Sequence, residues 1–169
     1  MIVLALVGLG IAAAAPIVAP ARSVPRWVAP IGSLIGLAIA AVAGTATAPV
    51  TGFALAATLV LTVAAATTGG APIVLAAFRF ARRQPDATPS PDPGPLRGGR
   101  IIGLLERTSV AVAILAGWPS GIAVILAVKG LARYPELREA NASEQFIIGT
   151  FTSVLWALAV CGVGFGLIT

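Results

Sequence analysis

Six apolar runs, separated by short polar stretches, make up most of this chain. They cover residues 2–21, 28–44, 53–78, 101–118, 122–128 and 145–168. A helix that crosses a lipid bilayer needs about 20 mostly apolar residues, and most of these runs approach or exceed that length. The pattern therefore predicts an all-α fold, a polytopic transmembrane bundle of about six helices.

The fifth run is shorter than the others. Even if it extends over residues 119–132, a helix there would reach only about 21 Å at 1.5 Å per residue. The hydrocarbon layer of a bilayer is about 30 Å thick. We expect either a short helix whose Lys129 extends toward the membrane surface, or one arm of a re-entrant hairpin.

Residues 84–99 differ in composition from the rest of the chain. Glycines, Ser90, Asp86 and Asp92 accompany five prolines: Pro85, Pro89, Pro91, Pro93 and Pro95. Such a segment has too little apolar surface to form a core, so it is expected to be an extended linker. It divides the chain into a three-helix half over 1–83 and a second three-helix half over 100–169.

The composition supports a membrane protein and the charges predict its orientation. Hydrophobic residues make up 58% of the chain and charged residues 10%, against about 45–50% and 25% in soluble domains. If the N-terminus is outside and every run crosses, ten of the eleven basic residues fall on one side: Arg22, Arg26, Arg79, Arg82, Arg83, Arg97, Arg100, Lys129, Arg133 and Arg138. Since basic residues collect on the cytoplasmic side, the linker is expected to be cytoplasmic and both termini outside.

One polar cluster is predicted in the second half. Its members are Glu106, Arg107, Lys129, Arg133 and Glu144. Neighbouring residues of a helix point about 100° apart, so Glu106 and Arg107 need different partners. We expect Glu106 to pair with Lys129, and Arg107 with Glu144. Two interpretations stay open: a structural network of ion pairs, or a site for an anion, a lipid headgroup or a proton.

Small residues recur every four positions in the second run, at Gly32, Gly36, Ala40 and Gly44. This spacing allows close approach of two helix backbones, either within the chain or between copies of it. The alternating Gly162, Gly164 and Gly166 are expected only to weaken the end of the last helix. The hydroxyls of Thr150, Thr152 and Ser153 are expected to bond backbone carbonyls.

A short repeat links the first and third runs. Ala15-Pro16-Ile17-Val18 recurs as Ala71-Pro72-Ile73-Val74. In an Ala-rich chain four residues can match by chance. The alternative is a pair of parallel helices with matching proline breaks, as in transporters with broken helices.

Several kinds of chemistry have no counterpart in the sequence. The chain has no histidine, which is the commonest general base and metal ligand. It also has no phosphate-binding glycine loop and no spacing typical of metal ligands. The basic residues are spread over loops without an aromatic platform, so a nucleic-acid partner is not expected. We expect neither an enzyme nor a bound cofactor or metal.

Three segments resemble a known family. They are Gly103–Arg107, Ala127–Tyr134 and Ile148–Thr150, with the pattern G-x-L-E-R, A-x-K-x-L-x-R-Y and I-G-T. Within residues 100–153 this resembles the membrane part of an uncharacterised bacterial integral-membrane family. The resemblance implies a multi-pass protein of the bacterial inner membrane and brings no activity with it.

Two functions are compatible with these features. The first is a non-catalytic accessory or scaffold protein of the membrane that packs against itself or against partner subunits. The second is a small transporter or channel for an ion, a lipid headgroup or another small solute, which would use Glu106, Arg107 and Lys129.

Overall fold

The computed structural model describes residues 1–18, 25–83, 99–134, 138 and 140–169 of the chain. Within them it contains six helices and no strand, so the predicted all-α class is confirmed. The helices are α1 (Ile2–Val18), α2 (Val28–Gly44), α3 (Gly52–Ala81), α4 (Gly99–Leu115), α5 (Gly121–Ala132) and α6 (Ala140–Ile168).

The helix boundaries follow the apolar runs closely. α2 coincides with the second run, and α5 has only 12 residues, as its run predicted. α4 begins at Gly99, one residue inside the predicted linker, and the rest of that linker lies outside the described residues. α4 ends because Gly117 adopts a φ of +73°, which lets the Trp118 amide donate to the Ala113 carbonyl at 2.8 Å.

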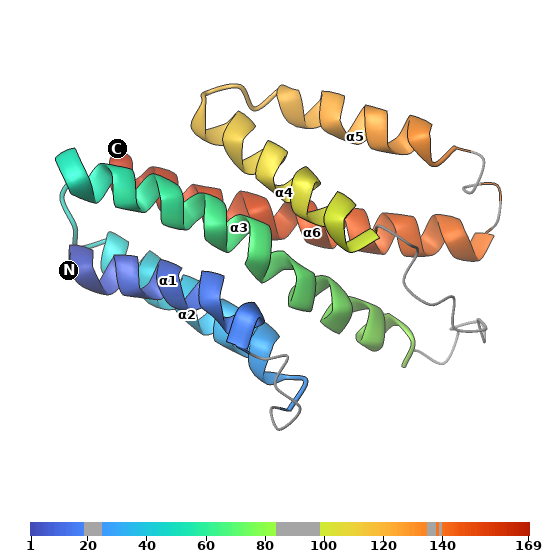
Figure 1. Ribbon diagram of the computed structural model, residues 1–169, viewed down its shortest axis with the longest axis horizontal. Helices are drawn as coiled ribbons and strands as arrows, with labels where there is room; N and C mark the ends of the chain where they lie inside the picture. Colours follow the sequence, from blue (N-terminus) through green and yellow to red (C-terminus); the bar gives the residue numbers. More distant parts are fainter. Residues whose placement is uncertain (19–24, 84–98, 135–137, 139) are drawn as a thin grey trace.

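Successive helices run in alternating directions, so the N- and C-termini lie at the same end of the bundle (Figure 1). α1 and α2 form a hairpin that packs on α3, and α3 pairs with α6 along the bundle. α4 packs on both α3 and α6, whereas α5 packs on α4 alone among the described helices. At the end where the termini lie, the Val50 amide donates to the Leu167 carbonyl at 3.0 Å.

The predicted ridge of small residues packs inside the chain. A Cβ added at Gly36 would come within 2.6 Å of the backbone of Gly8 and Ala12 in α1. Gly32 faces Ala15 of α1, and Ala40 is fully buried. The last member of the ridge, Gly44, faces Leu167 of α6. The ridge therefore packs against helices of the same chain, which is the first of the two roles predicted for it.

The two repeated prolines lie inside α1 and α3, which run parallel (Figure 1). Proline has no N–H, so Pro16 leaves the Ala12 carbonyl without its usual helical donor. The Ser33 hydroxyl of α2 donates to that carbonyl at 3.3 Å. One turn before Pro72, the Thr68 hydroxyl donates to the Ala13 carbonyl at 2.7 Å. Hydroxyls of neighbouring helices thus hold the proline regions together, as in membrane helices.

Two described helices are long and apolar enough to cross a membrane: α3, and residues 142–168 of α6. α1, α2 and α5 are apolar but shorter. In their most apolar windows only 28% of α3 and 33% of α6 is buried, whereas the core helix of a soluble protein is mostly buried. Length, composition and exposure are thus compatible with a membrane location for α3 and α6.

Candidate functional site

Two of the three charged residues of α4 lie in the interior of the bundle, whereas Arg100 near its start is exposed. Both Glu106 and Arg107 are buried, and Arg107 contacts the middle of α3 and of α6. At the same height along the bundle, Thr67 of α3 and Thr108 of α4 are joined by a hydrogen bond between their hydroxyls, whose oxygens lie 2.9 Å apart. The site is therefore remote from both ends of the two long helices.

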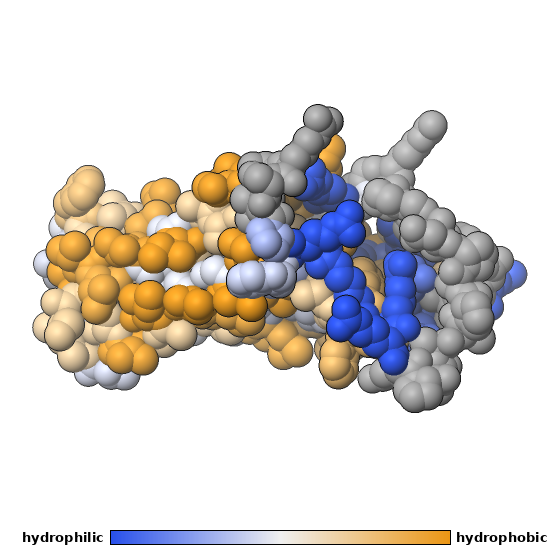
Figure 2. Space-filling model, turned by 90° about the horizontal axis from the view of Figure 1, so that it is seen from below, coloured by the Kyte–Doolittle hydropathy of each residue, from blue (hydrophilic) through white to orange (hydrophobic). Residues whose placement is uncertain are grey.

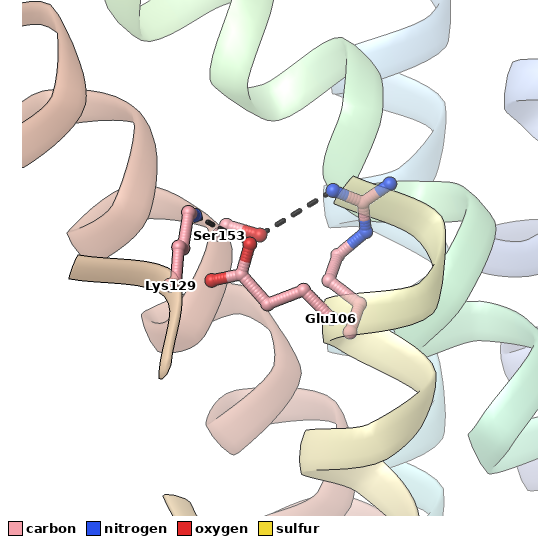
Figure 3. Close-up of polar contacts among 4 residues, drawn as sticks. Glu106, Lys129 and Ser153 are labelled. Carbon is pink, nitrogen blue, oxygen red and sulfur yellow. Dashed lines mark hydrogen bonds and ion pairs between the residues drawn. The ribbon is translucent and has the colours of Figure 1, made fainter. Parts of the chain in front are cut away.

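Glu106 forms the ion pair that the sequence predicts. One of its carboxylate oxygens, Oε2, accepts a hydrogen bond from the ammonium of Lys129 of α5 (Figure 3). The side chain of Glu106 is 5% exposed and that of Lys129 is 20% exposed, so the pair opens outward on the lysine side. The ammonium also lies 5.5 Å from the centre of the Phe146 ring of α6. This pair is a polar link between α5 and α4.

Arg107 is bound by neutral groups. It is 4% exposed; its Nε donates to the Thr67 carbonyl at 2.7 Å, and its Nη1 donates to the Ser153 hydroxyl at 3.3 Å (Figure 3). No carboxylate of the described residues lies within ion-pair distance of the guanidinium. The cation is thus compensated only by dipoles and by the charge of the adjacent Glu106.

The predicted pairing of Arg107 with Glu144 is absent. Glu144 is exposed in the first turns of α6, and Ser153, which binds the guanidinium, is nine residues further along. At 1.5 Å per residue that separation is about 13 Å, which is beyond the reach of an ion pair. Arg133 follows α5 and is half-buried. The structure therefore unites Glu106, Arg107 and Lys129 and leaves Glu144 outside the cluster.

Two adjacent glycines of α3, Gly69 and Gly70, make room for the site, and neither is among the residues predicted from the sequence. A Cβ at Gly70 would come within 2.8 Å of the Arg107 Nε, and one at Gly69 would collide with the Trp156 ring. Trp156 is buried and its indole Nε1 donates to the Ala65 carbonyl at 3.0 Å. The signal was available, because two consecutive glycines in the middle of an apolar helix cost stability and call for a packing reason.

The hydroxyls of α6 behave differently from the prediction. Ser153 bonds Arg107 instead of a backbone carbonyl. Thr150 is buried, and its Oγ1 has no hydrogen-bond partner. The second carboxylate oxygen of Glu106, Oε1, is likewise buried without a partner. Glu106 and Thr150 therefore each have one buried oxygen without a hydrogen-bond partner.

No group of three or more acidic, cysteine or histidine side chains in the described segments is arranged to hold a metal ion. No protein-family model, no curated protein and no solved structure matches this chain. The resemblance of residues 100–153 to an uncharacterised bacterial membrane family accordingly stays a prediction.

Proposed function

We propose that this chain is a multi-pass protein of the bacterial inner membrane that serves as a non-catalytic accessory or scaffold subunit. The membrane location is supported mainly by the distribution of side-chain sizes between the interior and the surface. The interior is dominated by alanines, such as Ala5, Ala12, Ala40, Ala65 and Ala157, while large apolar side chains of every helix are exposed. A soluble monomer rarely exposes so much contiguous apolar surface, whereas small residues at helix contacts are typical of membrane bundles.

The two ends of the bundle support the same proposal. Hydrophilic residues gather at the end where α3 terminates, and apolar residues cover the rest of the visible face (Figure 2). There the Arg79 side chain donates to the Arg26 carbonyl at 3.5 Å, and Trp27 and Tyr134 are exposed. The loops 45–51 and 116–120 toward the other end have no charged side chain and include the exposed Trp118. Aromatic residues at both surfaces and basic residues at one are typical of proteins oriented in a bilayer.

The dimensions of α4 fit this placement. From Thr108, α4 extends nine residues to Gly99 in one direction and seven residues to Leu115 in the other. At 1.5 Å per residue these separations are about 13 Å and 10 Å. A hydrocarbon layer about 30 Å thick that is centred on Thr108 would therefore reach a few ångströms beyond both ends of α4. α5 returns from the Leu115 end toward the basic end, and Arg107 would lie close to the midplane.

An open groove between α2 and α6 supports the accessory role. It has a volume of about 400 Å³ and is lined by Ala41, Gly44, Ala159, Gly162 and Gly166, among others. A Cβ at Gly162 or at Gly166 would meet no atom within 4 Å, so these glycines serve no contact inside the chain. Gly164, by contrast, packs on Thr62. A smooth glycine surface that faces lipid favours close approach of a transmembrane helix of a partner protein.

Purification from native membranes in mild detergent tests the accessory role. We expect a partner membrane protein at fixed stoichiometry, and we expect Gly162→Leu to release it because the added side chain fills the groove. Gly10→Leu is the matched control, since Gly10 of α1 also has no atom within 4 Å of an added Cβ. A partner retained equally by both variants, or a chain that purifies alone, would contradict the proposal.

A second candidate function is transport of an ion or small solute through the cluster of Glu106, Arg107 and Lys129. It is favoured by the position of Arg107 near the middle of the bundle without a carboxylate partner. A charge at the centre of a bilayer costs about 2.5–3.5 kcal/mol on insertion scales, and residues kept there despite that cost commonly mark an ion or proton pathway.

A further inference from the structure

One face of α5 is attached to the bundle and the rest of the helix is uncovered. α5 packs on α4 alone among the described helices and lies on the outside of the bundle (Figure 1). Ile122 and Ile125 pack against the hydrophobic core. Lys129 follows four residues after Ile125 and therefore lies on the same face. Away from that face Val124 and Val128 are exposed.

A row of small residues runs along the uncovered side of α5. Ala123, Ala127 and Gly130 are four and three residues apart, so they share one side of the helix. Both alanines are exposed, and a Cβ added at Gly130 would meet no atom within 4 Å. A row of this kind lets the backbone of a second helix approach closely. The charge beside it indicates what such a helix would carry.

The charges beside this row are not balanced within the described part of the chain. Glu106 supplies one carboxylate, and Arg107 and Lys129 supply two cations, so the cluster has an excess positive charge. Arg107 is 4% exposed, whereas the Lys129 side chain is 20% exposed, so the cluster opens outward at the lysine. Charged residues at membrane depth are costly and commonly pair with one another. A carboxylate brought to Lys129 from outside the chain would neutralise the cluster.

The depth of Lys129 favours a helix over a lipid headgroup as the source of that negative charge. Glu106, which holds the ammonium, is two residues from Thr108, or about 3 Å along α4. In a hydrocarbon layer about 30 Å thick and centred on Thr108, the pair lies roughly 12 Å inside the nearer boundary. Lipid phosphates lie outside that layer, whereas a side chain of another membrane-spanning helix can lie at the level of the ammonium.

We propose that the side of α5 formed by Ala123, Ala127 and Gly130 docks a transmembrane helix of a partner protein, and that a carboxylate of this helix accepts a hydrogen bond from the Lys129 ammonium. The inference rests on the proposed accessory role and names the chemistry of the partner. An ammonium has three N–H donors, so Lys129 can serve the partner and Glu106 together. The excess charge of the cluster selects a carboxylate over a neutral side chain.

This helix is distinct from one that would occupy the groove between α2 and α6. The groove is lined by Gly162, whereas Lys129 lies over Phe146 of the same helix. Sixteen residues separate Gly162 from Phe146. At 3.6 residues per turn, that separation places them about 160° apart around α6. The two surfaces can therefore be tested separately.

A synthetic transmembrane helix in phosphatidylcholine vesicles provides the probe. The peptide is a Leu/Ala-rich helix of about 20 residues with one central Glu, and its matched control has Gln at that position. Energy transfer measures binding, from a dye on Ser120→Cys of the full chain in a Cys161→Ala background to a dye on the peptide. We expect the Glu peptide to bind about tenfold more tightly than the Gln peptide, because only a carboxylate balances the charge of the cluster.

Three variants separate charge from close packing. Glu106→Gln leaves Lys129 without its partner in the chain, so the Glu peptide should bind several-fold more tightly still. Glu106→Gln combined with Lys129→Met should bind the Glu and Gln peptides equally. Gly130→Leu should weaken both peptides, since the added side chain prevents close approach. Gly10→Leu, the same change at an open position of α1, should weaken neither.

Equal binding of the two peptides by the unsubstituted chain overturns the proposal. A preference for the Glu peptide that persists in the double replacement does so too, as does binding that Gly130→Leu leaves unchanged. Displacement of the Glu peptide by phosphatidylglycerol added to the vesicles would assign Lys129 to a lipid headgroup and contradict the proposal. Because the helix is supplied as a peptide, these outcomes are independent of the accessory role, which co-purification of a native partner tests separately.

Discussion

Replacing Gly36 with Leu is expected to separate α1 from α2 and to lower the free energy of unfolding by more than about 3 kcal/mol, at the upper end of overpacking effects. The reason is that an added Cβ would lie 2.6 Å from the Ala12 amide nitrogen and the Gly8 carbonyl oxygen. These are backbone atoms, which cannot move aside as the end of a flexible side chain can. The effect should be seen in thermal unfolding in mild detergent and as a changed size in gel filtration.

Gly10→Leu is the control for this experiment as well, because it adds the same side chain to α1 where nothing lies within 4 Å. It is expected to change the free energy of unfolding by about 0.5 kcal/mol or less. If Gly36→Leu unfolds at the same temperature as this control, the close contact between α1 and α2 is absent from the folded protein.

Glu106→Gln is expected to destabilise the chain by roughly 2–3 kcal/mol. Breaking a fully buried ion pair costs about 3–5 kcal/mol, because one charge is left without a partner. The cost is smaller here because the Lys129 side chain is 20% exposed, so the pair is not fully buried. Chemical denaturation of the purified chain, followed by Trp fluorescence, measures it.

The double replacement Glu106→Gln with Lys129→Met should recover most of that loss, since no unpaired charge is then left near the site. Lys129→Met alone should be destabilising, because it leaves Glu106 charged, buried and without its cation. Additive effects of the two replacements would mean that the two residues do not interact, contrary to the ion pair in the structure.

The ion pair could be predicted from sequence because physical chemistry leaves few alternatives. A carboxylate in an apolar run needs a cation, and Lys129 is the basic residue that the following hairpin brings back toward Glu106. The helix boundaries could be predicted for a similar reason, since α2 and α5 are defined by where polar residues interrupt apolar ones. Both inferences depend only on where polar residues interrupt the apolar runs.

The environment of Arg107 could not be predicted in this way. Its partners include the Thr67 carbonyl, and a backbone carbonyl has no signature in the sequence. Its position also depends on the register of α3, α4 and α6, which brings Gly70 and Ser153 to the level of the guanidinium. The face of α6 that packs inward could not be predicted from the sequence either. Gly162 and Gly166 face outward and Gly164 inward, but a helix that is apolar on all sides has no periodic pattern from which its inner face can be read.

We propose that the bundle spans a bilayer with its basic end in the cytoplasm. Single cysteines at exposed positions test it most directly, in a Cys161→Ala background that removes the one native thiol: Ala48→Cys in the α2–α3 loop, Ser120→Cys at the α4–α5 turn and Ala132→Cys at the basic end. In intact cells an impermeant thiol reagent should label Ala48→Cys and Ser120→Cys, and should label Ala132→Cys only after permeabilisation. Labelling of Ala132→Cys in intact cells, or recovery of the protein in the soluble fraction, would contradict the account.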